Sequence, residues 1–204
     1  GAWMMSQRSH GELKWNTIST DHFDIHYHDG IKDIAVVGAS MAEQIRPVLM
    51  QQMGLDTLPR LDIAFTTEDE ILNGFAMPGN YTVIWIDQND AGLWAGDEKW
   101  LRTVLAHELQ HLVFLNTVKG PWWLPEPMNS LVAGVPGWLV EGLAEYYTEK
   151  WRPLRFDISH KGHVIRNTVH KIQDPHNDGF SKSLYLADRF GDSTITKILN
   201  HRNK

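Results

Sequence analysis

The chain has 204 residues and contains no cysteine, no long apolar run and no excess of basic residues. Without thiols it forms no disulfides, has no cysteine nucleophile and can bind zinc only through nitrogen and oxygen ligands. No window contains the roughly 18 to 20 apolar residues that a membrane-spanning helix needs. Residues 1–14 also lack the apolar segment of a signal peptide. We therefore expect no transmembrane segment in this chain.

The charge of the chain is mildly acidic, with 19 Lys and Arg against 25 Asp and Glu and a formal net charge of −6. Basic residues do not form a stripe that could neutralise phosphates, so we expect no nucleic-acid partner. The length suits one domain, residues 1–204, with a core large enough to fold without cross-links. No repeat or linker indicates a second domain.

Hydrophobic periodicity predicts strands and a helix near the start of the chain. Residues 21–28 alternate, with apolar side chains on one face and histidines and aspartates on the other, which predicts a half-buried strand. Apolar residues at helical spacing predict a helix from about residue 31 to a stop at Gly54. We expect Pro47 to kink or divide that helix, because proline lacks the amide donor. Residues 59–66 predict a second strand.

A hairpin is predicted where two runs flank a Pro-Gly-Asn turn at residues 78–80. The second run, residues 81–87, is rich in strand-forming residues, whereas the first contains Gly74 and belongs at a sheet edge. Because an edge strand can pair with an extended peptide, we interpret the first run as substrate-binding. That run consists of Asn73, Gly74, Phe75, Ala76 and Met77. An ordinary edge hairpin is the alternative.

The motif His-Glu-Leu-Gln-His occupies residues 107–111, inside an apolar run. On a helix, His107 and His111 lie on one face and can hold one cation, while Glu108 faces the same space. This HExxH pattern is typical of zinc hydrolases. The helix, which we expect Asp97 to cap, is apolar nearly all round, so burying these groups would be costly without a bound cation. The alternative is two core histidines with Glu108 exposed.

A second predicted helix starts at about residue 137, after a Pro- and Gly-rich connection at residues 120–136. Glu141 and Glu145 lie four residues apart on it, between apolar neighbours. Two histidines from one helix leave zinc in need of a third protein ligand, and Glu141 is the natural one. Glu145 would then accept the outer N–H of a ligating imidazole. Two solvent-facing acids are the alternative.

The C-terminal part of the chain gives weaker signals. Residues 160–172 are partly helical by their pattern, and the segment around them is difficult to assign. Residues 180–199 predict a helix that breaks near residue 190 and is followed by another helix from about residue 192.

Several segments together resemble one family. Residues 107–111, followed by Trp-Leu-Val-Glu-Gly-Leu-Ala-Glu-Tyr at residues 138–146, resemble the gluzincin zinc metallopeptidases, most closely the bacterial peptidase MA-like group. Residues 20–27, 73–76 and 185–191 also look like landmarks of that group, so the likeness covers roughly four-fifths of the chain.

The resemblance implies a zincin-like α+β fold. Such a fold has a small twisted mixed sheet and the catalytic helix in an upper lobe, here about residues 15–118. A mostly helical lower lobe would follow at about residues 119–204, with the cleft between the lobes.

The resemblance also implies a zinc-dependent peptidase that acts on peptide or protein substrates. One catalytic zinc ion would be held by His107, His111 and Glu141, with Glu108 as the general base. The residue that stabilises the oxyanion stays open, and the candidates are Tyr146, His176 and Tyr185.

The strand at residues 73–77 is where thermolysin-like relatives bind their substrate. It has no glutamate of the kind that holds a free amino terminus in aminopeptidases of this clan. This difference favours an endopeptidase.

Two alternatives belong to other functional classes. A catalytically inactive zincin-fold binding module would usually have a broken motif, and this motif is intact. A di-iron carboxylate bundle would need a second Glu-x-x-His unit, and neither Glu141 nor Glu145 has a histidine at the third following position. Relatives are often exported, so we expect an extracytoplasmic location, with a cytoplasmic one left open. The oligomeric state does not follow from the sequence.

Overall fold

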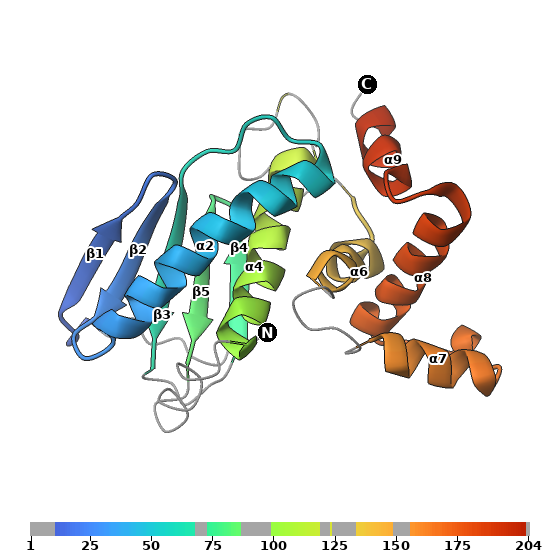
Figure 1. Ribbon diagram of the computed structural model, residues 1–204, viewed down its shortest axis with the longest axis horizontal. Helices are drawn as coiled ribbons and strands as arrows, with labels where there is room; N and C mark the ends of the chain where they lie inside the picture. Colours follow the sequence, from blue (N-terminus) through green and yellow to red (C-terminus); the bar gives the residue numbers. More distant parts are fainter. Residues whose placement is uncertain are drawn as a thin grey trace.

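The computed structural model describes residues 11–67, 73–86, 99–118, 123, 134–148 and 156–202. They form a mixed α+β fold with one five-stranded sheet and six α-helices (Figure 1). The strands are β1 (Trp15–Ser19), β2 (Phe23–His28), β3 (Leu61–Thr66), β4 (Asn73–Met77) and β5 (Tyr81–Trp85). The α-helices are α2 (Lys32–Met53), α4 (Lys99–Thr117), α6 (Gly137–Thr148), α7 (Asp157–Ile165), α8 (Pro175–Phe190) and α9 (Thr194–Arg202), and η1 (Val169–Lys171) is a 3-10 helix. The α+β class and the mixed sheet expected from the sequence are confirmed.

The sheet has the strand order β1-β2-β3-β5-β4. The three central strands are parallel, and the two edge strands β1 and β4 are antiparallel to their neighbours. Both α2 and α4 pack on one face of the sheet (Figure 1). A Cβ added to Gly38 of α2 would lie 2.5 Å from the ring of Phe65 in β3, so the absence of a side chain lets this helix approach the sheet closely.

The strand predicted at residues 21–28 is confirmed from Phe23 onward, with one error. His28 was expected on the solvent face but is only 3% exposed. Its Nδ1–H donates to the carbonyl oxygen of Asp29 at 3.0 Å, which leaves Nε2 to accept the backbone N–H of Thr67 at 3.2 Å. Partners outside the strand therefore allow this histidine to be buried.

The edge strand β1 was not predicted from the sequence. Its five residues alternate between exposed and half-buried positions, and none is fully buried. A strand that buries so little carries a weak hydrophobic pattern, because the pattern arises from a buried face.

The helix α2 runs from Lys32 to Met53 without interruption, so Pro47 does not divide it. Pro47 lies on the exposed face, where water can bond to the carbonyl that loses its helical partner. The predicted stop at Gly54 is confirmed, and this glycine adopts the left-handed conformation with a φ of 65°.

The predicted hairpin is confirmed as β4 and β5, with Met77 paired to Tyr81 and β4 at the sheet edge. The turn places Asn80 at a φ of 66° and Gly79 at 110°, conformations that suit asparagine and glycine.

The C-terminal helices differ from their predicted bounds. α7 covers residues 157–165 and η1 covers 169–171, in place of one helix within 160–172. α8 begins at Pro175, earlier than the predicted residue 180, because Asp174 caps it by accepting the backbone N–H of Asn177 at 3.2 Å. The break near residue 190 is confirmed, and α9 follows from Thr194.

Two expectations lie outside the described residues. These are the Asp97 cap and most of the connection at residues 120–136. Within the described ranges, no helix is both long enough and apolar enough to cross a membrane.

Candidate metal centre

His107 and His111 lie one turn apart on α4, and Glu141 of α6 faces both of them. The Nε2 atoms of the two imidazoles are 3.1 Å apart. The carboxylate Oε2 of Glu141 is 3.5 Å from His107 Nε2 and 3.3 Å from His111 Nε2. Three side chains that the sequence suggests as zinc ligands thus meet at nearly equal distances.

Separations of this size suit a tetrahedral metal ion. With bonds of about 2.0 to 2.1 Å to nitrogen and oxygen, two ligand atoms on tetrahedral zinc are about 3.3 Å apart. Two imidazole nitrogens and one carboxylate oxygen also leave a fourth position for water or substrate, as in catalytic zinc sites. The three side chains therefore fit one zinc ion.

The charges of the cluster favour a cation. Burial would raise the pKa of Glu141, but hydrogen bonds from His107 and His111 and the charges of His111 and His176 hold it well below its usual range. Burial would lower the pKa of His111, yet Glu141 and Glu108 raise it above its usual value. The carboxylates thus attract positive charge to the position that the imidazoles share.

Glu145 is buried one helical turn beyond Glu141, beside two histidines. Its Oε1 lies 3.5 Å from His107 Nδ1, an atom that is buried with no hydrogen-bond partner in the described part of the chain. The same Oε1 lies 2.9 Å from His176 Nδ1, within hydrogen-bond distance. Glu145 is therefore next to a candidate ligand, as expected, but its short hydrogen bond is with His176.

His176 is in the first turn of α8, and its ring stacks on that of His107 with the centroids 5.7 Å apart. Its hydrogen bond with Glu145 is the main cause of its raised pKa, and burial opposes that rise. The ligand atoms of His107, Glu141 and His176 all lie within 4.8 Å of one another, so these three could also hold a metal ion.

Two sets of ligands thus share His107 and Glu141. His111 Nε2 is 3.3 Å from Glu141 Oε2, whereas His176 Nδ1 is 3.6 Å from it and is already hydrogen-bonded to Glu145. His111 Nε2 is thus the closer of the two to Glu141, and it also lies 3.1 Å from His107 Nε2.

Glu108 is buried between α4 and the edge strand β4. The alternative of two core histidines expected this glutamate to be exposed, and that part of it is wrong. A Cβ added to Gly74 would lie 2.5 Å from the Cγ of Glu108, so glycine lets the strand come this close. The backbone N–H of Ala76 donates to the carboxylate. Burial raises the pKa of Glu108, and His111 and His107 oppose the rise only in part.

The strand interpreted as substrate-binding therefore lies directly against the motif helix. Gly74 is buried there, Asn73 is exposed, and Phe75, Ala76 and Met77 are half-buried. In the part of the chain that the structure describes, β4 pairs with β5 on one side and with no strand on the other.

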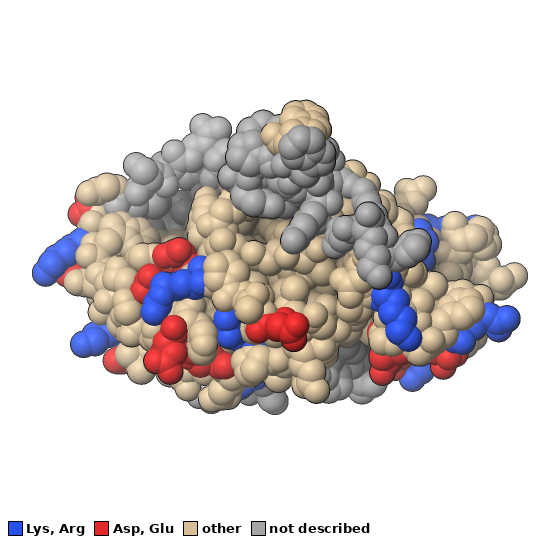
Figure 2. Space-filling model, turned by 90° about the horizontal axis from the view of Figure 1, so that it is seen from above, with Lys and Arg blue, Asp and Glu red and all other residues tan. Residues whose placement is uncertain are grey.

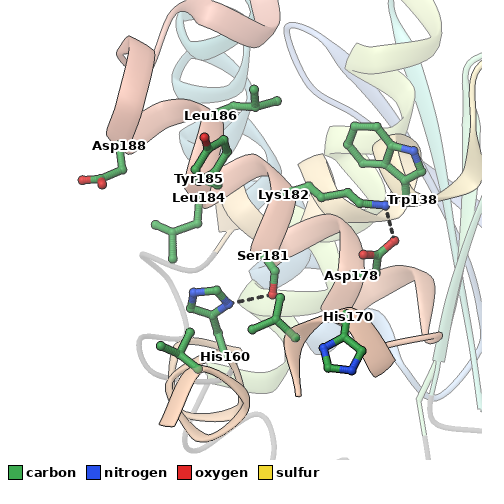
Figure 3. Close-up of a pocket in the computed structure, with 12 residues that line it drawn as sticks. Trp138, His160, His170, Asp178, Ser181, Lys182, Leu184, Tyr185, Leu186 and Asp188 are labelled. Carbon is green, nitrogen blue, oxygen red and sulfur yellow. Dashed lines mark hydrogen bonds and ion pairs between the residues drawn. The ribbon is translucent and has the colours of Figure 1, made fainter. Parts of the chain in front are cut away.

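The hydroxyl groups of the two candidate tyrosines are directed elsewhere. The hydroxyl of Tyr146 donates to Asp192 Oδ1 at 3.1 Å, and burial together with this aspartate raises the pKa of Tyr146 to about 12. Tyr185 is 60% exposed and lines a separate cavity beside α8 (Figure 3). Of the three oxyanion candidates, only His176 lies beside the candidate metal ligands.

Sequence reasoning did not predict what brings His176 to this place. A Cβ added to Gly142 of α6 would clash with the backbone of Gly179 in α8, and one added to Gly179 would clash with the carbonyl oxygen of Trp138. Two glycines therefore let α6 and α8 touch, which sets the first turn of α8 beside the glutamates of α6. The Asp174–Pro175 start of α8 was a recognisable signal in the sequence.

No protein-family model matches the chain, and no curated protein shows a significant match to it. The gluzincin assignment thus remains a resemblance carried by residues 107–111 and 138–146.

Proposed function

We propose that the chain is a zinc-dependent peptidase of the gluzincin type, and specifically an endopeptidase. The observation that carries the proposal is the meeting of two imidazole nitrogens and one carboxylate oxygen at 3.1 to 3.5 Å. We assign His107, His111 and Glu141 as the ligands of one zinc ion. The proposal includes the two zincin-like lobes, about residues 15–118 and 119–204, with the ligands contributed from both.

Glu108 is the proposed general base. Zinc, when bound, would lower the pKa of a water molecule toward roughly 7 and polarise a peptide carbonyl. The carboxylate of Glu108 accepts a proton from the attacking water and later returns it to the leaving amine. The raised pKa of Glu108 supports this role, because a base works best when its pKa lies near the working pH.

His176 is the proposed stabiliser of the oxyanion. Its raised pKa favours the imidazolium, in which Nδ1–H donates to Glu145 and Nε2–H remains to donate to the substrate carbonyl oxygen. Donors of this kind stabilise the negative charge that develops on that oxygen. Tyr146 and Tyr185 lack comparable support, because the first is hydrogen-bonded to Asp192 and the second lines another cavity.

The edge strand β4 is the proposed binding site for the substrate backbone. An extended peptide that added to the edge of β4 opposite β5, which no described strand pairs with, would lie along Asn73–Met77. The close contact between Gly74 and Glu108 supports this arrangement, since it puts the strand beside the proposed base. The absence of a glutamate from this strand supports cleavage within chains over cleavage at a free amino terminus.

A catalytically inactive binding module is the second candidate. It would use the same edge strand to hold a peptide without cutting it. Turnover decides between the two candidates, because peptide binding is common to both and the binding module either carries zinc or lacks it.

The decisive experiment measures bound zinc and hydrolysis of an unfolded, fluorescently labelled casein for the wild type and for Glu108→Gln. We expect the wild type to bind one zinc ion per chain and to cleave internal bonds. Glu108→Gln should retain the zinc and lose activity by roughly 10²- to 10⁴-fold. Wild-type zinc binding without any cleavage would support the binding module. Equal activity of the two proteins would refute the role of Glu108.

A further inference from the structure

Helix α7 exposes large apolar side chains at one end of the molecule. Ile158, Val164 and Ile165 are 63%, 54% and 84% exposed, and Val169 of the following η1 is 37% exposed. No residue of α7 is buried. A helix of a globular domain normally buries one apolar stripe, whereas α7 leaves its large apolar side chains exposed.

The same segment is basic although the whole chain is acidic. Residues 156–172 contain Lys161, Arg166 and Lys171 against the single acid Asp157, a formal charge of +2, whereas the chain carries −6. Figure 2 shows Lys and Arg side chains at the end of the molecule where α7 lies in Figure 1, with Asp and Glu side chains among them. This segment therefore has the opposite charge to the chain as a whole.

Apolar and basic side chains alternate on one face of α7. Ile158, Lys161 and Ile165 follow the i, i+3, i+7 spacing, which puts them on the same side of the helix. Lys161 contacts Asp157 at 2.6 Å, but both lie at the surface, and exposed pairs of this kind are weak. The amphipathic lysine stem can lie along an apolar surface while its charge stays in water.

The apolar surface continues inward into a cavity of about 810 Å³ between α6, α7, η1 and α8 (Figure 3). Val164 and Val169 belong both to the exposed surface and to the cavity wall. Polar groups of the wall pair with one another: His160 Nδ1 lies 2.7 Å from Ser181 Oγ, and Lys182 Nζ contacts Asp178 at 2.6 Å. The wall that remains is mainly apolar.

We propose that residues 157–171, called the α7–η1 surface, bind the surface of an anionic lipid bilayer. Its isoleucines and valines enter the boundary between headgroups and acyl chains, and Lys161, Arg166 and Lys171 contact the anionic headgroups. The remainder of the chain is acidic and is repelled by the same membrane, which favours an orientation with the α7–η1 surface toward it. The inference does not depend on the proposed peptidase activity.

A bilayer suits this surface better than an acidic protein does. Among the described residues Ile165 is the most exposed large apolar side chain, and it lies at the end of a short helix, next to Arg166 in the chain. Shallow insertion of single apolar side chains with flanking cations is how interfacial helices bind membranes. A protein partner would instead require a broad complementary patch.

The test is co-sedimentation of the full chain with vesicles of phosphatidylcholine, with and without phosphatidylglycerol. We expect binding to the mixed vesicles that falls as salt is added, and little binding to phosphatidylcholine alone. Ile165→Asp should lower the partition coefficient by about tenfold, and Lys171→Glu by at least roughly fivefold, since each charge lost near the surface has about that effect.

Matched controls lie on α2, away from the α7–η1 surface. Val36→Asp replaces another apolar side chain that is half exposed, and Lys32→Glu makes the same change of charge at another exposed lysine. Both should bind vesicles as the wild type does, and circular dichroism should show all four variants folded. If the controls lose binding as much as the test variants do, the surface assignment is wrong.

Two other results would overturn the proposal. If Lys171→Glu abolishes vesicle binding and Ile165→Asp leaves it intact, the surface is purely electrostatic. An acidic protein would recognise a surface of that kind. The wild type could instead form concentration-dependent dimers and fail to bind vesicles. If Ile165→Asp dissociates those dimers, the surface binds a second copy of the chain.

Discussion

Glu141 and Glu145 carry the same functional group and lie one turn apart on α6, but they face different atoms. Glu141 Oε2 lies between the Nε2 atoms of His107 and His111. Glu145 Oε1 lies near Nδ1 of His107 and is hydrogen-bonded to Nδ1 of His176. In the proposed function, Glu141 would bind the zinc ion and Glu145 would orient the histidines.

Removing each glutamate should therefore affect zinc binding differently. Glu145→Ala should weaken zinc binding by about 10- to 100-fold, the usual effect of losing a group that orients a ligand. Glu141→Ala should weaken it by more, because a ligand itself is lost. Competition with a coloured chelator at constant pH measures both affinities. Full zinc occupancy of Glu141→Ala at low zinc concentration would rule out Glu141 as a ligand.

Replacement of His176 should separate turnover from metal binding. We expect His176→Ala to retain zinc and to lose kcat by roughly 10²- to 10³-fold, the usual effect of removing an oxyanion donor. Tyr146→Phe and Tyr185→Phe serve as controls and should keep kcat close to that of the wild type. Loss of zinc from His176→Ala would instead make this histidine a ligand, and a larger loss in either tyrosine variant would move the oxyanion role to that tyrosine.

At the scale of elements, the contact between α6 and α8 depends on two glycines. Gly142 and Gly179 face each other where the helices cross, and a side chain on either would meet backbone atoms that cannot rotate away. This close packing sets the start of α8, with His176, against Glu145. Helix propensity alone disfavours both glycines, so packing has to account for them.

Alanine at this crossing should separate the two helices. Gly142→Ala should destabilise the fold by about 1 to 3 kcal/mol through overpacking, measured by urea unfolding. It should also lower kcat while zinc binding persists, because the candidate ligands lie on α4 and α6. Gly162→Ala in α7 is the control, since the atoms nearest to its Cβ would belong to the flexible side chain of Arg166, at 3.3 Å or more. Unchanged stability and kcat in Gly142→Ala would contradict this account of the crossing.

The edge strand β4 has a low strand propensity because it contains Gly74, and packing explains why a glycine stands there. A side chain at Gly74 would occupy the space of Glu108, so the glycine that weakens the strand also gives the carboxylate its place. The position of β4 at the sheet edge was predicted from the same glycine and is confirmed. Its role in holding substrate stays a prediction.

At the scale of the whole molecule, the candidate metal centre joins two parts of the chain. His107 and His111 come from α4, which packs on the sheet, whereas Glu141 comes from α6, which packs against α8. Figure 1 shows α6 to α9 gathered beside the sheet and its two helices. A bound ion would therefore link these two parts and stabilise both against unfolding.

Removal of zinc should lower the thermal stability of the wild type. At a zinc concentration of about 100 times Kd, the ion should contribute about 2.7 kcal/mol, which for a chain of this size is roughly 5 to 10 °C in Tm. Differential scanning calorimetry with zinc and with a chelator measures this difference. Glu141→Ala should show almost no difference between the two conditions. An unchanged Tm of the wild type would mean that no ion links the two parts.

Local features of the fold followed from the sequence alone. The alternation of residues 23–27, the helix stop at Gly54 and the four-residue spacing of His107 and His111 depend on periodicity and on the conformations open to glycine, which near neighbours in the chain determine. Only the tertiary structure decided that His28 is buried, that β1 forms and that Glu145 is bonded to His176. Those outcomes depend on contacts such as that between Glu145 and His176, 31 residues apart in the chain. A local pattern carries no information about such partners, because packing of whole elements brings them together.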